Sequence, residues 1–161
     1  MTILTIDDIL RIPDENFDYG ALDTQRLVGL ALQRYEPWLA TSALGELAQR
    51  GAPETADAAT TILRAEPWDV RLTAYALTIL FNRDPELAIR EMTRIITTQD
   101  APAILAAMIE NVLSARERFD TGTGRDFAIK LAERLLRVPP DESIEDGNEF
   151  LAIYGPGAGN A

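Results

Sequence analysis

The tripeptide Glu-Pro-Trp occurs twice, thirty positions apart, and this repetition constrains the fold more than any other feature of the sequence. Its two copies are 36–38 and 66–68, and Asp100-Ala101-Pro102 follows about one further period along the chain. Each marker opens an apolar run, which a short break separates from a second apolar run. A repeat of this length is typical of helix pairs that stack on one another. The sequence therefore predicts a series of stacked helical pairs.

Residues that start or stop helices divide the chain into seven expected helices. Pro37 and Pro67 suit the first helical position, where the N–H that proline lacks is not needed. Gly51 follows an apolar run, as a helix-ending glycine does, and Pro139-Pro140 ends the last helix. The expected helices span 23–35, 37–50, 53–65, 67–82, 85–98, 101–118 and 125–138, and a short additional helix is expected at 5–12 with Thr5 as its cap.

Two of these helices are expected at the centre of the fold. The run 70–81 carries one charge and the run 103–109 carries none, and a helix that is apolar around most of its circumference is enclosed on several sides. Helices 85–98 and 125–138 instead show one apolar stripe each. The residues expected to face inward are Ala88, Ile89, Met92, Ile95 and Ile96 in the former, and Phe127, Ala128, Leu131, Leu135 and Leu136 in the latter.

The second repeat resembles a HEAT-type repeat. Its residues 67–77 place Pro and Asp before Val70-Arg71, small residues follow, and Asp84-Pro85 makes the turn to the next helix. The resemblance covers about 36–138, with a first repeat that has Leu39-Ala40 in place of Val-Arg and a third that has a longer, glycine-containing turn. It implies an all-α fold, a HEAT-like right-handed α-solenoid of about three helix pairs with an extra N-terminal helix. In such repeats the arginine of the Val-Arg pair often bonds to the turn of an adjacent repeat, so the resemblance gives Arg71 that role.

The net charge of −11 is concentrated at the two ends of the chain. Residues 1–23 hold six acids and one arginine, and residues 139–161 hold five acids and no base. The stretch between them has 15 acids and 14 bases. We therefore divide the sequence into an acidic N-terminal segment (1–22), a helical-repeat domain (23–138) and an acidic, Gly-rich C-terminal tail (139–161).

The sequence contains neither cysteine nor histidine, which restricts its chemistry. Disulfides, thiol nucleophiles and histidine-dependent triads are excluded, and the acids are not spaced as a metal-ligand set. The glycine-containing stretch 121–125 lacks the Gly-Lys-Ser/Thr ending of a phosphate loop and is interpreted as an interhelical turn. We therefore expect a protein that is not an enzyme and that has no cofactor or metal.

The same sequence disfavours nucleic acid and membranes as partners. Binding to a phosphate backbone requires a clustered positive surface, which a nearly neutral body does not supply. The first residues lack the basic start and long apolar core of a leader. The longest apolar stretches, 72–81 and 101–109, are shorter than the roughly 20 residues that span a bilayer. We expect a cytoplasmic protein.

Helical repeats with broad, shallow surfaces bind proteins more often than they catalyse reactions. We therefore expect a non-enzymatic protein–protein binding module, most specifically a small bacterial immunity or antitoxin-type inhibitor that blocks a partner toxin with a basic surface. A HEAT-like enzyme of the bilin-lyase or DNA-glycosylase kind, and a scaffold subunit of a larger complex, remain alternatives.

Two groups of charged residues and one pair of aromatic residues are the candidates for partner binding. Trp38 and Trp68, at equivalent repeat positions, either pack between neighbouring repeats or form an aromatic platform. The first charged group lies on the helices that would line the concave side, and the second is the acidic C-terminal stretch. The first comprises Arg64, Glu86, Arg90, Arg94 and Arg134, and the second comprises Asp141, Glu142, Glu145, Asp146 and Glu149.

Overall fold

The computed structural model describes residues 17–158, and every regular element in that range is a helix. This confirms the expected all-α class for the described part of the chain. The chain divides into two compact units, which we call the N-terminal unit (1–83) and the C-terminal unit (84–161). The helix expected at 5–12 lies outside the described residues.

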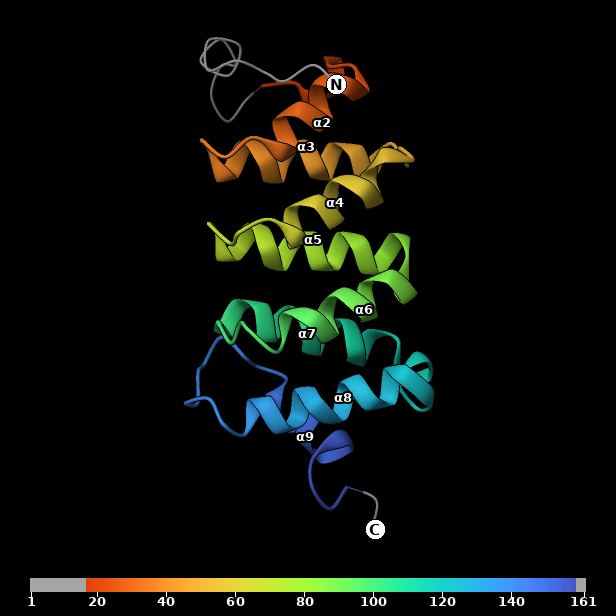
Figure 1. Cartoon of the computed structure of the whole chain (residues 1–161), viewed down its shortest axis with the longest axis vertical. Coiled ribbons are helices and arrows are strands. Elements are labelled where there is room, and N and C mark those ends of the chain that lie inside the picture. Colours follow the sequence, from red (N-terminus) through yellow and green to blue (C-terminus); the bar gives the residue numbers. More distant parts are fainter. Residues whose placement is uncertain (1–16, 159–161) are drawn as a thin grey trace. The chain divides into compact units, whose positions relative to one another are not determined.

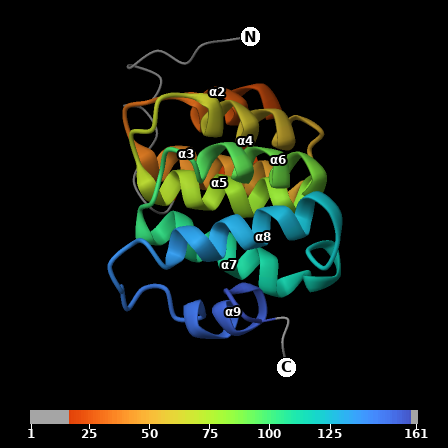
Figure 2. The same cartoon turned by 60° about the horizontal axis from the view of Figure 1, so that its bottom comes forward.

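The N-terminal unit contains a 3₁₀ helix and four α-helices. They are η1 (Tyr19–Ala21), α2 (Thr24–Leu32), α3 (Pro37–Gln49), α4 (Glu54–Arg64) and α5 (Val70–Arg83). Helix α2 lies beside α4 and α3 lies beside α5, while α2 packs on α3 and α4 packs on α5 (Figures 1 and 2). The fully buried side chains that hold these helices together are mainly leucines: Leu27, Leu30, Leu44, Leu47, Leu72, Leu77 and Leu80.

Side chains at the helix starts explain why these segments are helical. The carboxylate of Asp23 accepts a hydrogen bond from the backbone N–H of Arg26 at 2.8 Å, which satisfies one of the N–H groups left unpaired at the start of α2. Pro37 occupies the first turn of α3, as expected. The expectation for Pro67 is wrong: the Asp69 carboxylate caps the N–H of Leu72 at 2.7 Å, so α5 begins only at Val70.

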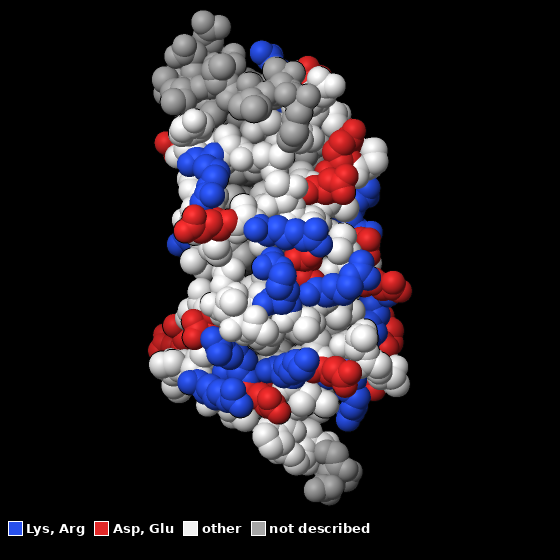
Figure 3. Space-filling view, viewed as in Figure 1, with Lys and Arg blue, Asp and Glu red and all other residues white. Residues whose placement is uncertain are grey.

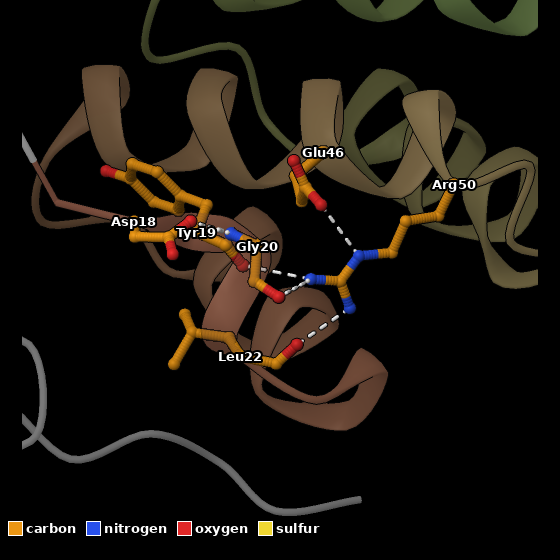
Figure 4. A network of polar contacts seen from close by, with 6 residues as sticks. All are labelled: Asp18, Tyr19, Gly20, Leu22, Glu46 and Arg50. Carbon is orange, nitrogen blue, oxygen red and sulfur yellow. Dashed lines mark hydrogen bonds and ion pairs between the residues drawn. The ribbon is translucent and has the colours of Figure 1, made fainter.

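Arg50, which follows α3, fixes the chain segment that precedes α2 (Figure 4). Its guanidinium donates to the carbonyl oxygens of Tyr19, Gly20 and Leu22 at 2.7–3.0 Å. The Glu46 carboxylate, one turn back along α3, accepts from Nε at 2.7 Å and orients the group. One side chain therefore joins α3 to the segment 17–22.

Arg83, the last residue of α5, makes the corresponding contact one repeat later. Its Nη2 donates to the carbonyl oxygens of Gly51 and Ala52 at 3.0 and 3.3 Å, in the turn between α3 and α4. Arg71, which the HEAT resemblance gave this role, is exposed and makes no side-chain hydrogen bond within 17–158. Within the N-terminal unit, arginines at the ends of α3 and α5 thus make the contact to a preceding turn that the resemblance gave to Arg71.

The C-terminal unit contains α6 (Pro85–Ile95), α7 (Pro102–Ser114), η2 (Arg116–Arg118), α8 (Gly122–Leu135) and α9 (Gly147–Tyr154). Helix α8 packs against α6 and α7, and α9 packs against both α7 and α8 (Figure 2). Three phenylalanines dominate its core. Phe119 and Phe127 lie with ring centroids 6.2 Å apart, and Phe150 comes from α9.

The expected burial is confirmed for most of these helices. All five residues of the α6 stripe are buried, and Leu77 and Met108 on the two central helices are completely inaccessible. Two residues of the α8 stripe are corrections: Leu135, the last residue of α8, is half-buried, and Leu136, which caps the helix end, is 55% exposed.

Helix α9 is the largest departure from the expected organisation. Residues 139–161 were expected to form an acidic, Gly-rich tail, but residues 147–154 within them form a helix. That helix buries Phe150 completely and Tyr154 almost completely. Burial raises the pKa of the Tyr154 phenol, and the nearby Asp120 carboxylate adds to this shift. The stretch therefore supplies part of the core of the C-terminal unit.

Candidate functional site

A cleft of about 750 Å³ opens in the C-terminal unit between α6, η2 and the start of α8. Helix α6 contributes Glu86, Ile89, Arg90 and Thr93 to its walls. The turn 121–124 closes one side, and α8 contributes Asp126, Phe127 and Lys130, while Glu117 and Arg118 come from η2. The cleft thus has an apolar floor and a charged rim.

Three basic side chains of the cleft rim have no ion pair within the described residues. Arg90, Arg118 and Lys130 are all exposed, and each comes from a different element. Three acids, Glu86, Glu117 and Asp126, line the same cleft. Figure 3 shows both basic and acidic side chains on the displayed face. The rim is therefore a mixed-charge surface whose cations are available to an external carboxylate.

Two glycines shape the turn at the start of α8. A Cβ atom at Gly124 would lie 2.0 Å from the carbonyl oxygen of Arg118, so only glycine allows α8 to approach η2 this closely. Gly122 has φ +60°, a left-handed conformation that other residues rarely adopt. Gly124 therefore serves the close packing of α8 on η2, and Gly122 serves the backbone conformation of the turn that precedes it. The helix expected to begin at 125 begins at Gly122 instead.

The five residues predicted for the charged face come from three helices, α4, α6 and α8. Glu86 and Arg90 line the cleft, whereas Arg94 binds the buried carboxylate of Glu91 on its own helix at 3.0 Å. Arg134 binds Asp100 at 3.2 Å. Arg64 is the last residue of α4 and belongs to the N-terminal unit. Within the C-terminal unit, Glu86 and Arg90 are therefore the members of this group that line the cleft.

The second predicted group, between 141 and 149, is an exposed acidic segment that leads into α9. All five carboxylates of this segment are exposed, while Gly147 and Phe150 are buried. Glu149 pairs with Arg116. Glu142, Glu145 and Asp146 have no side-chain hydrogen bond or ion pair within 17–158. These three carboxylates are presented to solvent by a segment that α9 anchors.

Asp141 is held by a local turn. Its carboxylate accepts hydrogen bonds from the hydroxyl and from the backbone N–H of Ser143, the latter at 2.9 Å. These two bonds favour the ionised form and lower the pKa of Asp141. The carboxylate that begins the acidic segment therefore stays charged to a lower pH than an ordinary aspartate.

The loop between α2 and α3 displays aromatic side chains. Tyr35 is 58% exposed and Trp38 is 43% exposed. The side chain of Gln33, which is buried, orders this loop: its Oε1 accepts from the N–H groups of Tyr35 and Glu36 at 2.7 and 3.0 Å, and its Nε2 donates to the carbonyl oxygen of Glu36 at 2.7 Å. The exposure of Trp38 favours the aromatic-platform interpretation of this residue over packing between repeats.

Sequence reasoning missed Arg118 and Lys130 as members of a cleft. Both lie far from Arg90 in the sequence, and only the packing of α8 against α6 and η2 brings them to the same rim. The Thr-Gly-Thr-Gly turn was the available signal, because two glycines so close together indicate a turn with unusual backbone geometry.

Comparisons with known proteins return nothing: no protein-family model, no curated protein and no solved structure matches this chain. Within residues 17–158, no group of three or more acidic side chains could hold a metal ion. No helix in that range is long and apolar enough to cross a membrane.

Proposed function

We propose that this protein is a cytoplasmic, non-enzymatic binding module that recognises another protein through that protein's basic surface. In its most specific form it is a small bacterial immunity or antitoxin-type inhibitor that covers a partner toxin. The observation that carries the proposal is the acidic segment 141–149, whose exposed carboxylates stand on a segment that α9 anchors in the core.

An anchored acidic segment is a better binding surface than a loose one. A mobile tail must lose conformational freedom when it binds, at about 1–2 kcal/mol for each residue whose backbone becomes fixed. Here Phe150 and Tyr154 hold α9 against α7 and α8, and hydrogen bonds between Asp141 and Ser143 form a local turn at the other end of the segment. The exposed carboxylates therefore attract a basic partner at a low entropic cost.

The repeated contacts of the N-terminal unit support a HEAT-like right-handed α-solenoid as the architecture. Arg50 and Arg83 stand thirty-three positions apart, and each joins the end of one helix to a turn about thirty residues back along the chain. A solenoid built of such pairs exposes a broad surface for its size, which suits an inhibitor that acts by covering its target.

The cleft in the C-terminal unit is a second candidate site for binding another protein. Arg90, Arg118 and Lys130 could receive a carboxylate-bearing segment of an acidic partner. The two sites demand partners of opposite charge, so one experiment distinguishes them.

The test is affinity capture with three variants whose recovered proteins are compared with those of the wild type by mass spectrometry. The first carries E142Q, E145Q and D146N, which alter side chains that make no contacts within the described residues. The second carries R90E and R118E. The matched control carries E54Q, E110Q and E133Q, which remove the same charge from exposed positions elsewhere.

The proposal expects a basic protein that the wild type and the control recover and that the E142Q/E145Q/D146N variant loses. The association rate of this protein with the basic partner should fall as the salt concentration rises, because exposed charges are screened beyond roughly 8–10 Å at physiological ionic strength. Loss of the partner only with the R90E/R118E variant would assign binding to the cleft. Equal recovery by all variants would contradict both sites.

A further inference from the structure

The two copies of Glu-Pro-Trp differ in what covers the indole ring. The Arg34 guanidinium lies 5.9 Å from the ring centroid of Trp68 and donates to the carbonyl oxygen of Glu66 at 2.9 Å. Trp38 is 43% exposed, and no cation lies over its ring within residues 17–158. The second copy therefore binds an arginine from within the chain, whereas the first copy offers the same local sequence to solvent.

The first copy is already fixed in shape. The buried Gln33 side chain makes three hydrogen bonds to the backbone of Tyr35 and Glu36, and Pro37 begins α3 immediately afterwards. Tyr35, Glu36 and Trp38 are thus presented by an ordered loop and the first turn of a helix. A site that is fixed before binding avoids the cost of ordering its side chains.

The chemistry of the first copy suits a cation. Indole is the aromatic side chain that binds cations best, and arginine is its commonest partner. The carboxylate of Glu36, two residues before Trp38, is exposed and makes no hydrogen bond or ion pair within the described residues. An aromatic face with a neighbouring carboxylate favours a guanidinium over a neutral or an acidic group. Tryptophan, tyrosine and arginine are also the residues that dominate binding energy at protein interfaces.

We propose that Tyr35, Glu36 and Trp38 form a docking surface for an arginine side chain on a basic partner protein, which binds over Trp38 as Arg34 binds over Trp68. This inference rests on the proposed function, because it supplies a second contact for the same kind of partner. It differs from the acidic segment in requiring an aromatic ring as well as negative charge.

The experiment uses the peptide Gly-Arg-Gly-Arg-Gly-amide with a fluorescent dye on its N-terminus, and its binding to the full chain is followed by fluorescence anisotropy. A second peptide with citrulline in place of arginine keeps the shape of the side chain but removes its charge. We expect saturable binding of the arginine peptide and much weaker binding of the citrulline peptide.

Variants then locate the site. W38A should weaken arginine-peptide binding roughly two- to fivefold, as expected for the loss of an exposed cation–π contact, and W38F should retain most of the affinity. Y35A and E36Q should also weaken binding, and both remain informative if W38A is unstable. E54Q, the matched control, removes one exposed carboxylate elsewhere in the same unit and should leave the affinity unchanged.

Three outcomes would overturn the inference. Equal loss in E36Q and E54Q would mean that net charge alone attracts the peptide. Equal binding of the citrulline peptide would mean that the surface takes a neutral or apolar partner. Arg11 lies outside the described residues and is tested by the variant R11A in a W68F background. A shift of Trp38 emission in this variant would mean that the arginine over Trp38 belongs to the chain itself.

Capture experiments separate this inference from the proposed function. If a basic partner is captured through 141–149 but the peptide is insensitive to Trp38 and Glu36, only the docking surface is refuted. If the peptide binds in a Trp38-dependent manner and no basic protein is captured, only the proposed function is refuted.

Discussion

The N-terminal and C-terminal units use equivalent arginines in different ways. Arg50, Arg83 and Arg116 are spaced thirty-three positions apart, and each lies at or just after the end of a helix. The first two donate to backbone carbonyl oxygens of a distant turn, whereas Arg116 pairs with the exposed carboxylate of Glu149. A carbonyl contact survives any change of the partner's side chain, while an exposed ion pair contributes little and weakens with salt. The N-terminal unit therefore uses these arginines to build the fold, and the C-terminal unit uses its arginine at the surface.

The two units also differ in the residues that fill their cores and in the length of the connections between their helices. Leucines fill the N-terminal unit, whereas Phe119, Phe127 and Phe150 fill the C-terminal unit. The turn between α3 and α4 is short, whereas the corresponding connection between α7 and α8 contains η2 and leads into two glycines, Gly122 for its left-handed backbone and Gly124 for close packing. The longer connection creates the cleft. Departure from a regular repeat is thus what produces a candidate site.

The largest expected effect comes from placing a charge in either core. L77D in the N-terminal unit and M108D in the C-terminal unit bury a carboxylate where the native side chain is inaccessible. Each should cost at least about 4 kcal/mol of unfolding free energy, measured by urea denaturation followed by circular dichroism. L136D should be tolerated, because Leu136 is 55% exposed. An unchanged midpoint for L77D or M108D would refute the placement of that core.

The next effect tests the glycine-dependent turn of the C-terminal unit. G124A places a Cβ 2.0 Å from the Arg118 carbonyl oxygen, so α8 must move away, at a cost of about 3 kcal/mol. G122A meets no atom within 4 Å and should cost only about 1 kcal/mol, from its left-handed backbone. Thermal denaturation of the two variants gives the comparison. Equal losses would show that backbone conformation, and not close packing, makes glycine necessary here.

A smaller effect compares the three arginines directly. R50A removes three hydrogen bonds to carbonyl oxygens and should destabilise the protein by about 2 kcal/mol, whereas R83A removes two and should cost somewhat less. R116A should cost less than about 1 kcal/mol, because its ion pair is exposed. Chemical denaturation at low and high salt measures all three. An R116A effect as large as that of R50A would remove the distinction between the two units.

The smallest effect concerns the acidic segment. The pKa of Asp141 is lowered in the folded protein by its bonds to Ser143, so its contribution to stability is present above the ordinary aspartate pKa of 3.8 and is lost as pH falls through the lowered value. S143A should raise the Asp141 pKa toward 3.8, as followed by carboxyl-carbon NMR during acid titration. An unshifted Asp141 in S143A would mean that the turn does not hold the carboxylate.

The elements that could be predicted from sequence are those governed by local chemistry. Proline at the first turn marks the start of α3, and the stripe from Ala88 to Ile96 identifies the buried face of α6. Where two residues each favour a different start for the same helix, the start can be predicted only if their relative strengths are known. Pro67 suggested an early start for α5, but the Asp69 cap, two residues later, determines the observed one. The acidic composition of 141–149 likewise obscured the apolar residues Phe150 and Tyr154, which form α9.

The candidate site was less predictable, because it depends on long-range packing. The sequence identified Glu86 and Arg90 from their place on one helix face. It could not bring Arg118 and Lys130 to the same cleft, since that requires the approach of α8 to η2 that Gly124 permits. Exposure decided the interpretation of the tryptophans in the same way. Identical tripeptides place Trp68 beneath Arg34 and leave Trp38 43% exposed with no cation over its ring within residues 17–158, because the arginine comes from a distant part of the chain.

The carbonyl contacts of Arg83 make the N-terminal unit suited to recombination. Because the guanidinium binds the backbone of Gly51 and Ala52, the contact depends on the path of the chain and not on side-chain identity. The segment from Gly51 to Arg83 contains both partners of this contact: the carbonyl acceptors lie at its start and the arginine donor lies at its end. Such a segment can be duplicated or exchanged, and its surface residues can be substituted, while the hydrogen bonds between its two ends are retained.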